Sequence, residues 1–344
     1  MKITFVSPHS LRNFGGGERW HISIGNMLVE KGIEVEMYAM SYIPTAKPRL
    51  TMEEVNSMIK FPYHEIDFKA GKYNPRRMKK VPQLASDVFY ISGGYYFFLR
   101  QCLKFSGPKI FGFHDPALQT PENLLQRMIV NKLFPKFNSI HILNEQQKIL
   151  IPLSVKTFLL PNTWFEQLPA FEDKFEKFTV FFFGRHEVSK GIDTLEYVLS
   201  HLSREIEFFI AGSGSVKINL PEDKPNVYFL GFVDDKELSY YLSRSHVVLF
   251  PSYSEASSGV ATETLAHSTP LVYRDIPQNG LLNNIDLNIK CKSNQEFLTA
   301  IQNLKKLYET DKMGYFERCK KLGKSLITPE TYINTIIGEA KKLV

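Results

Sequence analysis

The stretch SYSEASSGVATETLAHSTP, residues 252–270, lies between two apolar runs, HVVLF at residues 246–250 and LVYR at residues 271–274. Short apolar runs bounded by turn residues are typical of buried strands. The segment therefore has the form strand, turn, helix, strand, with Glu255 in the turn and Glu263 in the helix. FTVFFFGRHEVSKGIDTLEYVL, residues 178–199, has the same form, and its loop carries Arg185 and Lys190.

Strand-like and helical segments alternate along the rest of the chain, which predicts an α/β fold with parallel sheets and right-handed crossovers. Residues 163–177 interrupt this alternation, because they are polar and have no apolar period. We expect two domains, residues 1–162 and 178–327, joined by a linker at 163–177, and a helix at 328–344 that packs back on the first domain. The expected strands are residues 2–8, 33–40, 87–92, 108–114, 138–144 and 156–162, and then 178–183, 206–212, 226–232, 246–250 and 270–274.

The composition of the 344 residues is that of a globular protein, with 43% hydrophobic and 23% charged residues, and the length suits two domains. Cys102, Cys291 and Cys319 are far apart and lack metal-ligand spacing, so neither a disulfide framework nor a zinc site is expected. The chain enters a strand at once and has no run of about 18 apolar residues. We expect a cytoplasmic protein that is neither exported nor membrane-spanning.

Basic residues are concentrated in the first half of the chain, where residues 1–170 hold 21 Lys and Arg against 13 Asp and Glu. The densest group, KYNPRRMKK at residues 72–80, contains Arg76, Arg77, Lys79 and Lys80. It is either a solvated surface loop or a patch for a phosphate-bearing acceptor or the cytoplasmic face of a membrane. No nucleic-acid reading motif accompanies it, so nucleic acid is not an expected partner.

The two loops quoted first carry charges that a nucleotide sugar requires. Sugar transfer leaves negative charge on a diphosphate, and Arg185 and Lys190 can stabilise it in place of a metal ion. The chain lacks the Asp-x-Asp pair usual in metal-dependent transferases, so no metal or other cofactor is expected. Glu263 flanks the apolar stripe of its helix, where a carboxylate is costly unless hydroxyl groups donate to it. The alternative is a pair of surface cations and a pair of structural carboxylates.

Weaker signals lie elsewhere. A turn with Gly16 and Gly17 opens a helix and would let a phosphate approach its N-terminus, although tight turns also need glycine. His114 follows an expected strand at the edge where open α/β sheets bind ligands, but a lone histidine is more often structural. AGSGSV at residues 211–216 lacks the third glycine of a dinucleotide-binding fingerprint, which argues against NAD as a ligand.

Several segments in this order, GGGER, HDP, LLPN, FFFGRHEVSKGIDTL, FFIAGSG, NVYFLGFVDDKEL and PSYSEASSGVATETLAHSTPLV, resemble retaining glycosyltransferases of family 4. The resemblance covers most of residues 1–275. It implies the GT-B fold, in which two Rossmann-like domains face a cleft. One departure is the turn after Ser254, where the common Glu-Gly-Phe-Gly is replaced by Glu255-Ala256-Ser257-Ser258.

The resemblance also implies roles for individual residues. Arg185 and Lys190 would neutralise the donor diphosphate, Glu255 would contact the hexose, Glu263 the ribose, and His114 would lie near the reacting anomeric carbon. A donor phosphate oxygen would receive the acceptor proton, so no side-chain base is required. The other implied donor-binding residues are Gly16, Gly17, Gly184, Gly212, Phe232, Ser257, Ser258 and Gly259.

The function expected from these observations is metal-independent, retaining transfer of a sugar from a nucleoside-diphosphate sugar to a glycan or lipid-linked acceptor. Two alternatives stay open. A nucleotide-sugar epimerase or hydrolase would need a further acid or base in the cleft, and a non-catalytic nucleotide-sugar-binding protein is compatible with the altered turn at residues 256–258.

Overall fold

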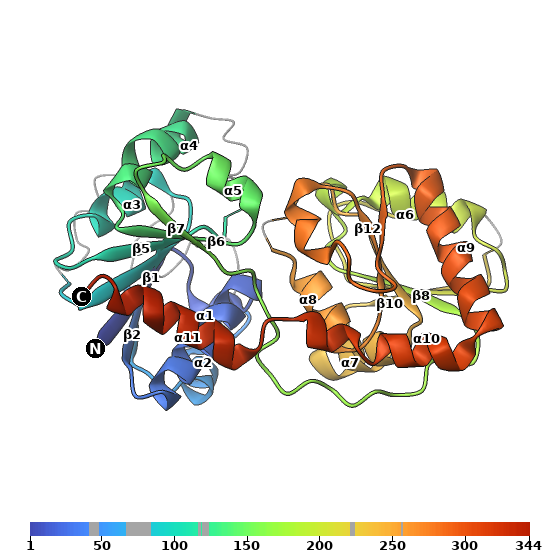
Figure 1. Ribbon diagram of the computed structural model, residues 1–344. Helices are drawn as coiled ribbons and strands as arrows, with labels where there is room; N and C mark the ends of the chain where they lie inside the picture. Colours follow the sequence, from blue (N-terminus) through green and yellow to red (C-terminus); the bar gives the residue numbers. More distant parts are fainter. Residues whose placement is uncertain (41–47, 67–83, 116–117, 119–123, 221–223, 256) are drawn as a thin grey trace. The chain divides into compact units, whose positions relative to one another are not determined.

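The computed structural model describes residues 1–40, 48–66, 84–115, 118, 124–220, 224–255 and 257–344. Its internal contacts divide the chain into two units (Figure 1). Unit 1 comprises Met1–Pro161 together with Glu330–Val344, and unit 2 comprises Asn162–Pro329. Each unit is an α/β domain built on one parallel sheet, which is the predicted fold class.

Unit 1 has a seven-stranded sheet with the order β3-β2-β1-β4-β5-β6-β7. The register places Phe5 of β1 opposite Met37 on one side and Tyr90 on the other. The strands are β1 (Lys2–Ser7), β2 (Glu34–Met40), β3 (Tyr63–Ile66), β4 (Val88–Ser92), β5 (Lys109–Gly112), β6 (Ser139–Ile142) and β7 (Lys156–Leu159). The helices are α1 (Gly16–Glu30), α2 (Met52–Met58), α3 (Tyr96–Cys102), α4 (Leu124–Met128) with a π-helical continuation at Ile129–Leu133, α5 (Glu145–Ile149) and α11 (Pro329–Lys341).

Alternate residues of β1 face different helical layers. Phe5 lies edge-on against Trp20 of α1, with ring centroids 6.1 Å apart. Val6 belongs to the apolar cluster that contains Phe98 of α3 and Ile129. Both faces of the central strands are therefore covered, which explains why those strands are apolar along their whole length.

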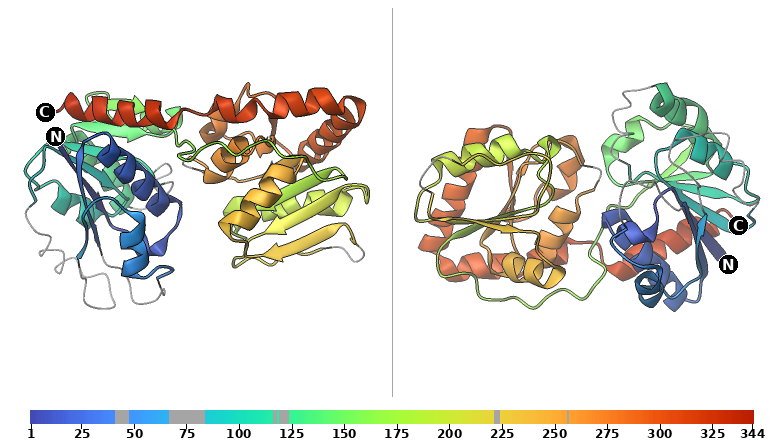
Figure 2. Two further views of the ribbon diagram at one scale, coloured as in Figure 1. Left: turned by 90° about the horizontal axis from the view of Figure 1, so that it is seen from below. Right: turned by 180° about the vertical axis from the view of Figure 1, so that it is seen from behind.

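The C-terminal helix α11 belongs to unit 1, where it lies beside the sheet (Figure 2). The indole Nε1 of Trp20 donates a hydrogen bond of 2.9 Å to the hydroxyl of Tyr332 in α11. Tyr332, Ile333 and Ile336 are buried. The chain thus returns to its first domain after completing unit 2.

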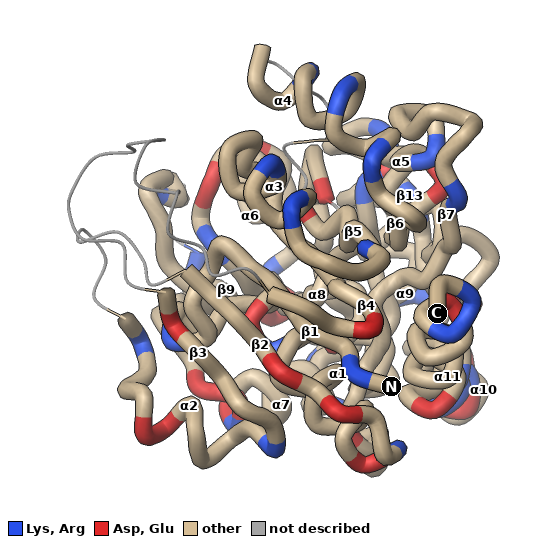
Figure 3. Tube along the Cα trace, turned by 90° about the vertical axis from the view of Figure 1, so that its left-hand side faces the viewer, with Lys and Arg blue, Asp and Glu red and all other residues tan. Residues whose placement is uncertain are grey.

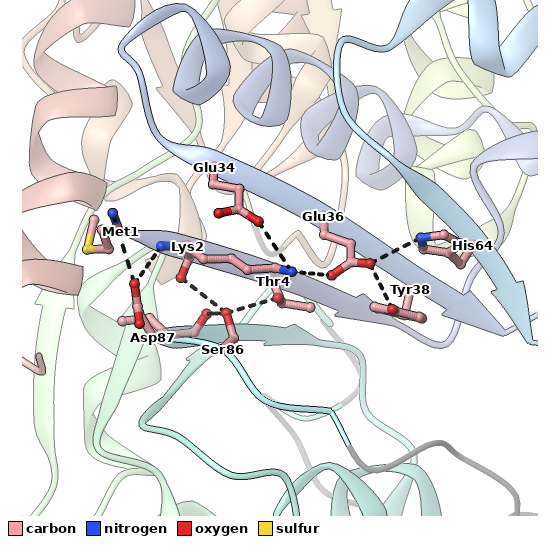
Figure 4. Close-up of polar contacts among 10 residues, drawn as sticks. Met1, Lys2, Thr4, Glu34, Glu36, Tyr38, His64, Ser86 and Asp87 are labelled. Carbon is pink, nitrogen blue, oxygen red and sulfur yellow. Dashed lines mark hydrogen bonds and ion pairs between the residues drawn. The ribbon is translucent and has the colours of Figure 1, made fainter.

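Ion pairs and hydrogen bonds join the amino ends of the unit 1 strands (Figure 4). Lys2 Nζ lies 2.8 Å from Glu36, whose carboxylate also accepts a 2.8 Å hydrogen bond from Tyr38. His64 Nε2 is 3.1 Å from the same carboxylate, and Asp87 accepts from the backbone of Lys2. Figure 3 shows acidic residues along β2 and basic residues on α3 and α5. These polar pairs lie at the edge of the sheet opposite to the carboxyl edge, where ligands of open α/β sheets bind.

Unit 2 has a six-stranded sheet with the order β10-β9-β8-β11-β12-β13. Val180 and Phe182 of β8 face α6 and α9, and Phe181 and Phe183 face α7 and α8. The strands are β8 (Thr179–Phe183), β9 (Glu207–Ala211), β10 (Val227–Gly231), β11 (Val247–Phe250), β12 (Leu271–Arg274) and β13 (Ile289–Cys291). The helices are α6 (Ile192–His201), α7 (Asp235–Arg244), α8 (Gly259–Ala266), α9 (Asn294–Thr310) and α10 (Lys312–Cys319), with 3-10 turns η6 (Val188–Lys190), η7 (Pro277–Leu282) and η8 (Leu322–Ser325).

Residues 163–177, expected to be a linker, contain no helix or strand and are grouped with unit 2. Lys174 within them is buried, and its ammonium donates to the carbonyls of Ser243 and Ser268 and to the Thr269 hydroxyl. Burial lowers the pKa of Lys174 to about 8. These bonds to neutral oxygens hold this part of the segment on its own domain.

The structure also contains elements that the pattern did not predict. Helix α2 and strand β3 lie in the region where the periodicity was weak, because α2 depends on a capping box between Thr51 and Glu54 and β3 is a short strand of mixed polarity. Strand β13 and helix α10 were also missed. Helix α7 begins with a capping box, in which the Asp234 side chain accepts a hydrogen bond from the backbone of Glu237.

Candidate functional site

The strand order of unit 2 reverses between β8 and β11. Chain connections run outward from β8 to β9 on one side and from β11 to β12 on the other. In open α/β sheets, ligands bind at such a switch point, outside the carboxyl ends of the two strands. The loop after β8 carries Arg185 and Lys190, and the loop after β11 carries Glu255, so three predicted site residues follow the two strands at this point.

Lys190 and Glu255 form an ion pair across the two loops. Lys190 Nζ lies 2.6 Å from Glu255 Oε1, and the side chains are 20% and 11% exposed. Because the pair is largely shielded from water, its mutual attraction is stronger than that of an exposed surface pair. The structure thus brings together one cation and one carboxylate that the sequence placed 65 residues apart.

Backbone contacts hold these two loops together. The amide of Tyr253 donates a 2.8 Å hydrogen bond to the carbonyl of Ser189. Gly191, the N-cap of α6, has a φ of 72°, and a Cβ added to it would lie 2.3 Å from the carbonyl oxygen of Pro251. Only glycine adopts this conformation at low cost and allows such an approach. Gly191, which follows Lys190, therefore allows the η6 loop to contact the turn before Glu255.

Arg274, at the end of β12, contacts two residues of the turn that precedes Glu255. It is buried, and its Nε donates a 2.8 Å hydrogen bond to the carbonyl of Pro251. Its guanidinium lies 3.9 Å from the ring centroid of Tyr253, a cation–π contact. Tyr253 in turn donates to Asp193 of α6 at 2.6 Å. Sequence reasoning missed Arg274 as a supporting residue; an arginine ending an otherwise apolar strand was the available signal.

Arg185, unlike Lys190, pairs with a residue of its own loop. Its side chain is 72% exposed and pairs with Glu187 in the same loop, with Nη1 2.9 Å from Oε1. An exposed pair of this kind is weak and allows the guanidinium to move to another anion. Phe232, which follows β10, is also largely exposed. Both residues are at the carboxyl edge of the sheet, and neither is fixed there by packing.

The loops after β8 and β9 meet at Gly184 and Gly212. Gly212 has a φ of 112°, and a Cβ added there would lie only 1.9 Å from the carbonyl oxygen of Gly184. The Gly212 amide donates to the carbonyl of Gly231. Part of the glycine pattern read as donor-binding is therefore required for the two loops to pass each other.

Helix α8 begins at Gly259, and the Ser258 side chain caps it by accepting from the backbone of Ala261 at 3.3 Å. Glu263 is therefore the fifth helical residue, which is too far along the helix for a capping box. It is partly exposed, and its carbonyl accepts from His267 Nδ1 at 2.7 Å. Ser257 accepts a hydrogen bond from the Asn162 amide at 3.2 Å, so this predicted donor-binding residue also anchors the start of unit 2.

In unit 1 the strand order reverses between β1 and β4. The glycine turn follows β1, and α1 begins at Gly16 with Gly15 as N-cap. The Glu18 carboxylate accepts from the Gly15 amide at 2.9 Å, so one of the free amides at this helix N-terminus has a partner within the chain. Gly16 and Gly17 have no atom within 4 Å of an added Cβ. A ligand therefore has room to approach the backbone at these two residues.

His114 lies just beyond β5 and is partly exposed. Its Nε2 is 2.9 Å from the hydroxyl of Tyr90 in β4, and that hydroxyl is 2.6 Å from Nδ1 of His141 in β6. Burial, with smaller contributions from His141 and His21, lowers the pKa of His114 well below its usual value. Tyr90 and His141 were read from the sequence only as strand residues. Polar residues inside otherwise apolar strands were the signal that would have found them.

Three expectations concern larger features. The basic residues Arg76, Arg77, Lys79 and Lys80 lie outside the described residues, so the predicted patch has no structural account. Within the described ranges, no three His, Cys, Asp or Glu side chains gather as ligands for a metal ion. No helix in the described part of the chain has the length and apolar character needed to cross a membrane.

Comparison with known proteins finds a family model that matches the part of the chain containing this site. Residues 177–306 match the family model of glycosyl transferases group 1, and this range contains Arg185, Lys190, Glu255 and Glu263. An uncharacterized 41.2 kDa protein of the cps region of Klebsiella pneumoniae is 31% identical over 102 residues. That match covers 29% of this chain and 28% of the Klebsiella protein, so the chain matches little more than a quarter of that relative.

Similar solved structures extend over the whole chain. HepE from Anabaena, in complex with UDP and glucose, has a TM-score of 0.75 at 14% identity, with all of both chains covered. Sucrose-phosphate synthase from Thermosynechococcus elongatus has a TM-score of 0.74 at 14% identity, covering 99% of this chain and 98% of that one. A mutant of S. aureus TarM, in complex with fondaparinux, alpha-GlcNAc-glycerol and UDP, has a TM-score of 0.70 at 13% identity, covering 100% and 99%. The chain therefore has the GT-B fold, and residues 177–306 of its C-terminal unit match the glycosyl transferases group 1 family model.

Proposed function

We propose that the chain is a retaining glycosyltransferase that moves a sugar from a nucleoside-diphosphate sugar to a hydroxyl group of a glycan or lipid-linked saccharide, without a metal ion. The observation that carries the proposal is the Lys190–Glu255 pair at the switch point of unit 2, inside the residues that match the family model. UDP is named in the complexes of HepE and TarM, which makes UDP-sugars the first donors to test.

The pair supports this function by its charge. In the structure, the Glu255 carboxylate balances the charge of Lys190, whose Nζ lies 2.6 Å from Oε1. A donor diphosphate can replace the carboxylate as partner of the ammonium, which releases Glu255 to accept hydrogen bonds from the sugar. Lys190 would then stabilise the charge that grows on the leaving diphosphate as the glycosidic bond breaks. Arg185 can turn from Glu187 to the same diphosphate, since its side chain is exposed.

The proposed reaction conserves configuration. The bond from the anomeric carbon to the diphosphate oxygen breaks, and the acceptor oxygen bonds to that carbon on the same face. The proton of the acceptor hydroxyl passes to an oxygen of the departing diphosphate. This step needs no base from the protein, and neither Lys190 nor Glu255 is required to gain or lose a proton.

The test is a turnover assay with UDP-, GDP- and ADP-sugars, each combined with soluble and lipid-linked acceptors. We expect nucleoside diphosphate release that requires acceptor, an unchanged rate after chelation of divalent metals, and a product with the anomeric configuration of the donor. Release without acceptor would indicate a hydrolase, and a donor altered at one carbon an epimerase. Donor binding without turnover in any combination would indicate a binding protein.

Contact with a lipid-linked acceptor is a separate part of the proposal. It concerns the basic group at residues 72–80, whose charge suits phosphate groups of an acceptor or of anionic lipids. Replacing Arg76, Arg77, Lys79 and Lys80 by alanine should weaken sedimentation with anionic vesicles and leave turnover of a soluble acceptor unchanged. Equal vesicle binding by the two proteins would remove this group from the acceptor site.

A further inference from the structure

A chain of polar groups crosses the core of unit 1 through the neighbouring strands β4, β5 and β6. His141 Nε2 lies 2.6 Å from the carbonyl oxygen of Leu160, and His141 Nδ1 lies 2.6 Å from the Tyr90 hydroxyl. The Tyr90 hydroxyl lies 2.9 Å from His114 Nε2. Tyr90 and His141 are buried, so water does not supply alternative partners.

The direction of each hydrogen bond in this chain follows from the Leu160 carbonyl at one end of the chain. A carbonyl only accepts, so His141 Nε2 must carry a hydrogen and donate it to Leu160. Burial lowers the pKa of His141 to about 4, so near neutral pH the ring is uncharged and Nδ1 is an acceptor. The single hydroxyl hydrogen of Tyr90 must therefore point to His141. The Tyr90 oxygen can then only accept from the other side, and His114 Nε2 must be the donor.

We propose that Tyr90 and His141 are positioning residues that fix His114 as the Nε2–H tautomer and present its Nδ1 as a hydrogen-bond acceptor for a hydroxyl group of the sugar substrate. The proposal rests on the proposed function for the identity of that hydroxyl group. No hydrogen bond to His114 Nδ1 occurs among the residues that the structure describes. A neutral ring with an acceptor facing outward suits a hydroxyl donor and does not suit a phosphate oxygen.

Packing leaves the ring of His114 little freedom to adopt another arrangement. Trp20 lies against it with ring centroids 4.6 Å apart. A Cβ added to Gly112 would lie 2.5 Å from the Tyr90 hydroxyl and 2.7 Å from His114 Cδ2. Glycine at this strand end therefore leaves the space in which the hydroxyl and the imidazole meet. A ring turned by 180° would place a carbon in contact with the Tyr90 hydroxyl and forfeit the hydrogen bond.

The tautomer can be measured without any turnover. Long-range proton–nitrogen NMR of the full chain with labelled histidine distinguishes the two neutral tautomers, and His114→Ala identifies the signal among the nine histidines. We expect His114 and His141 both as Nε2–H tautomers at pH 7. A protonated Nδ1 on His114 would overturn the proposal. This result is independent of sugar transfer, so failure of the tautomer assignment and failure of the transferase function are distinguishable.

Tyr90→Phe tests the positioning role. Loss of the hydroxyl should convert the His114 signal to a mixture of tautomers and lower kcat/KM for transfer about tenfold, the size of one ordinary hydrogen bond. Tyr332→Phe is the matched control, because it removes a phenol hydroxyl that accepts from Trp20 in the same core and keeps the ring that lies 6.2 Å, centroid to centroid, from His141. It should leave the tautomer of His114 unchanged. An unchanged His114 signal in Tyr90→Phe, or equal losses of kcat/KM in the two variants, would overturn the proposal.

Discussion

The glycines at the carboxyl edges of the two sheets differ in what surrounds them. In unit 2, a Cβ at Gly212 would overlap the carbonyl oxygen of Gly184, and one at Gly191 would overlap that of Pro251. In unit 1, a Cβ at Gly16 or Gly17 would meet no atom within 4 Å. Gly191 and Gly212 of unit 2 therefore allow loops of the protein to touch each other, whereas Gly16 and Gly17 of unit 1 leave open space next to a helix N-terminus.

The same contrast applies to the charged and polar groups. In unit 2 the Lys190–Glu255 pair is held by interlocking loops, supported by the buried Arg274. In unit 1, His114 is held by a hydrogen-bonded chain within the sheet. A glycine that the fold does not require is better evidence for ligand approach than one that packing already explains. The positions of glycine in the sequence alone could not distinguish a glycine required by packing from one that leaves room for a ligand.

Gly212→Ala should have the largest effect on stability. The φ of 112° is unfavourable for alanine, and the added Cβ would lie 1.9 Å from backbone that cannot move aside. We expect the free energy of unfolding of unit 2 to fall by about 4 kcal/mol, the sum of backbone strain and overlap. Hydrogen exchange of the β8 and β9 amides measures this. Gly231→Ala is the control, because Gly231 also has a positive φ, of 68°, but has open space around it. Equal losses of unfolding free energy in the two variants would contradict the overlap explanation.

Lys190→Ala should have the largest effect on transfer. Removing the cation that faces the leaving diphosphate is expected to lower kcat by about 10²-fold or more, equivalent to about 3 kcal/mol. Lys177→Ala is a matched control, since Lys177 pairs with Glu207 at 3.2 Å near the amino end of β8 and is mostly exposed. That variant should turn over like the parent. A Lys190→Ala enzyme with unchanged kcat would remove Lys190 from the mechanism, and donor affinity measured by calorimetry would show whether binding is also lost.

Much of the fold was predictable because its signals are local. The apolar run at residues 178–183 became β8, and Asp234 and Ser258 cap the helices that follow them. The missed elements depend on tertiary context: β3 reads YHEI, a mixed sequence, and forms a strand only by pairing with β2. Local pattern carries no information about such a pairing.

The site was predictable to a lesser extent. Lys190 and Glu255 were expected near each other because both follow strands at a carboxyl edge, and the structure places them in contact. The contact between Arg185 and Glu187 involves residues two apart and is a rotamer choice that spacing does not decide. The chain from Leu160 to His114 depends on the order β4-β5-β6 in the sheet. That order brings together side chains 24 and 51 residues apart along the chain.

Acid should destabilise unit 1 more than unit 2. Burial lowers the pKa of His21 and of His141 to about 4, and the pKa of His114 falls well below its usual value. In unit 2, burial lowers the pKa of His246 to about 3 and lowers the pKa of His267 and His186 by smaller amounts. Between pH 6.5 and pH 4 the unfolded chain binds protons at these rings and the folded chain does not, so stability falls as the pH falls. The expected loss between pH 7 and pH 5 is about 2 kcal/mol for each such histidine.

Hydrogen exchange measured at pH 7 and pH 5 separates the two units, after correction for the intrinsic pH dependence of exchange. Amides of β5 should lose more protection than amides of β11, because three histidines of unit 1 have strongly lowered pKa values, compared with His246 in unit 2. Equal losses in the two strands would contradict the assignment of His21, His114 and His141 as neutral rings. In that case the hydrogen-bonded chain in unit 1 would not require the proton arrangement derived for it.

Gly16→Ala should have the smallest effect on stability and so isolates the role of ligand approach. Gly16 is the first residue of α1, its φ is not positive, and an added Cβ meets nothing within 4 Å. The free energy of unfolding is therefore expected to change by no more than about 0.5 kcal/mol, or to rise slightly because alanine restricts the unfolded chain. Gly338→Ala, in the interior of α11 with equally open surroundings, is the matched control.

If a donor phosphate or the acceptor approaches the backbone at Gly16, kcat/KM should fall about tenfold in Gly16→Ala and stay unchanged in Gly338→Ala. Transfer at the parent rate in both variants would mean that the open space at this turn is not part of the site, and the glycines of unit 1 would then need an explanation other than ligand approach.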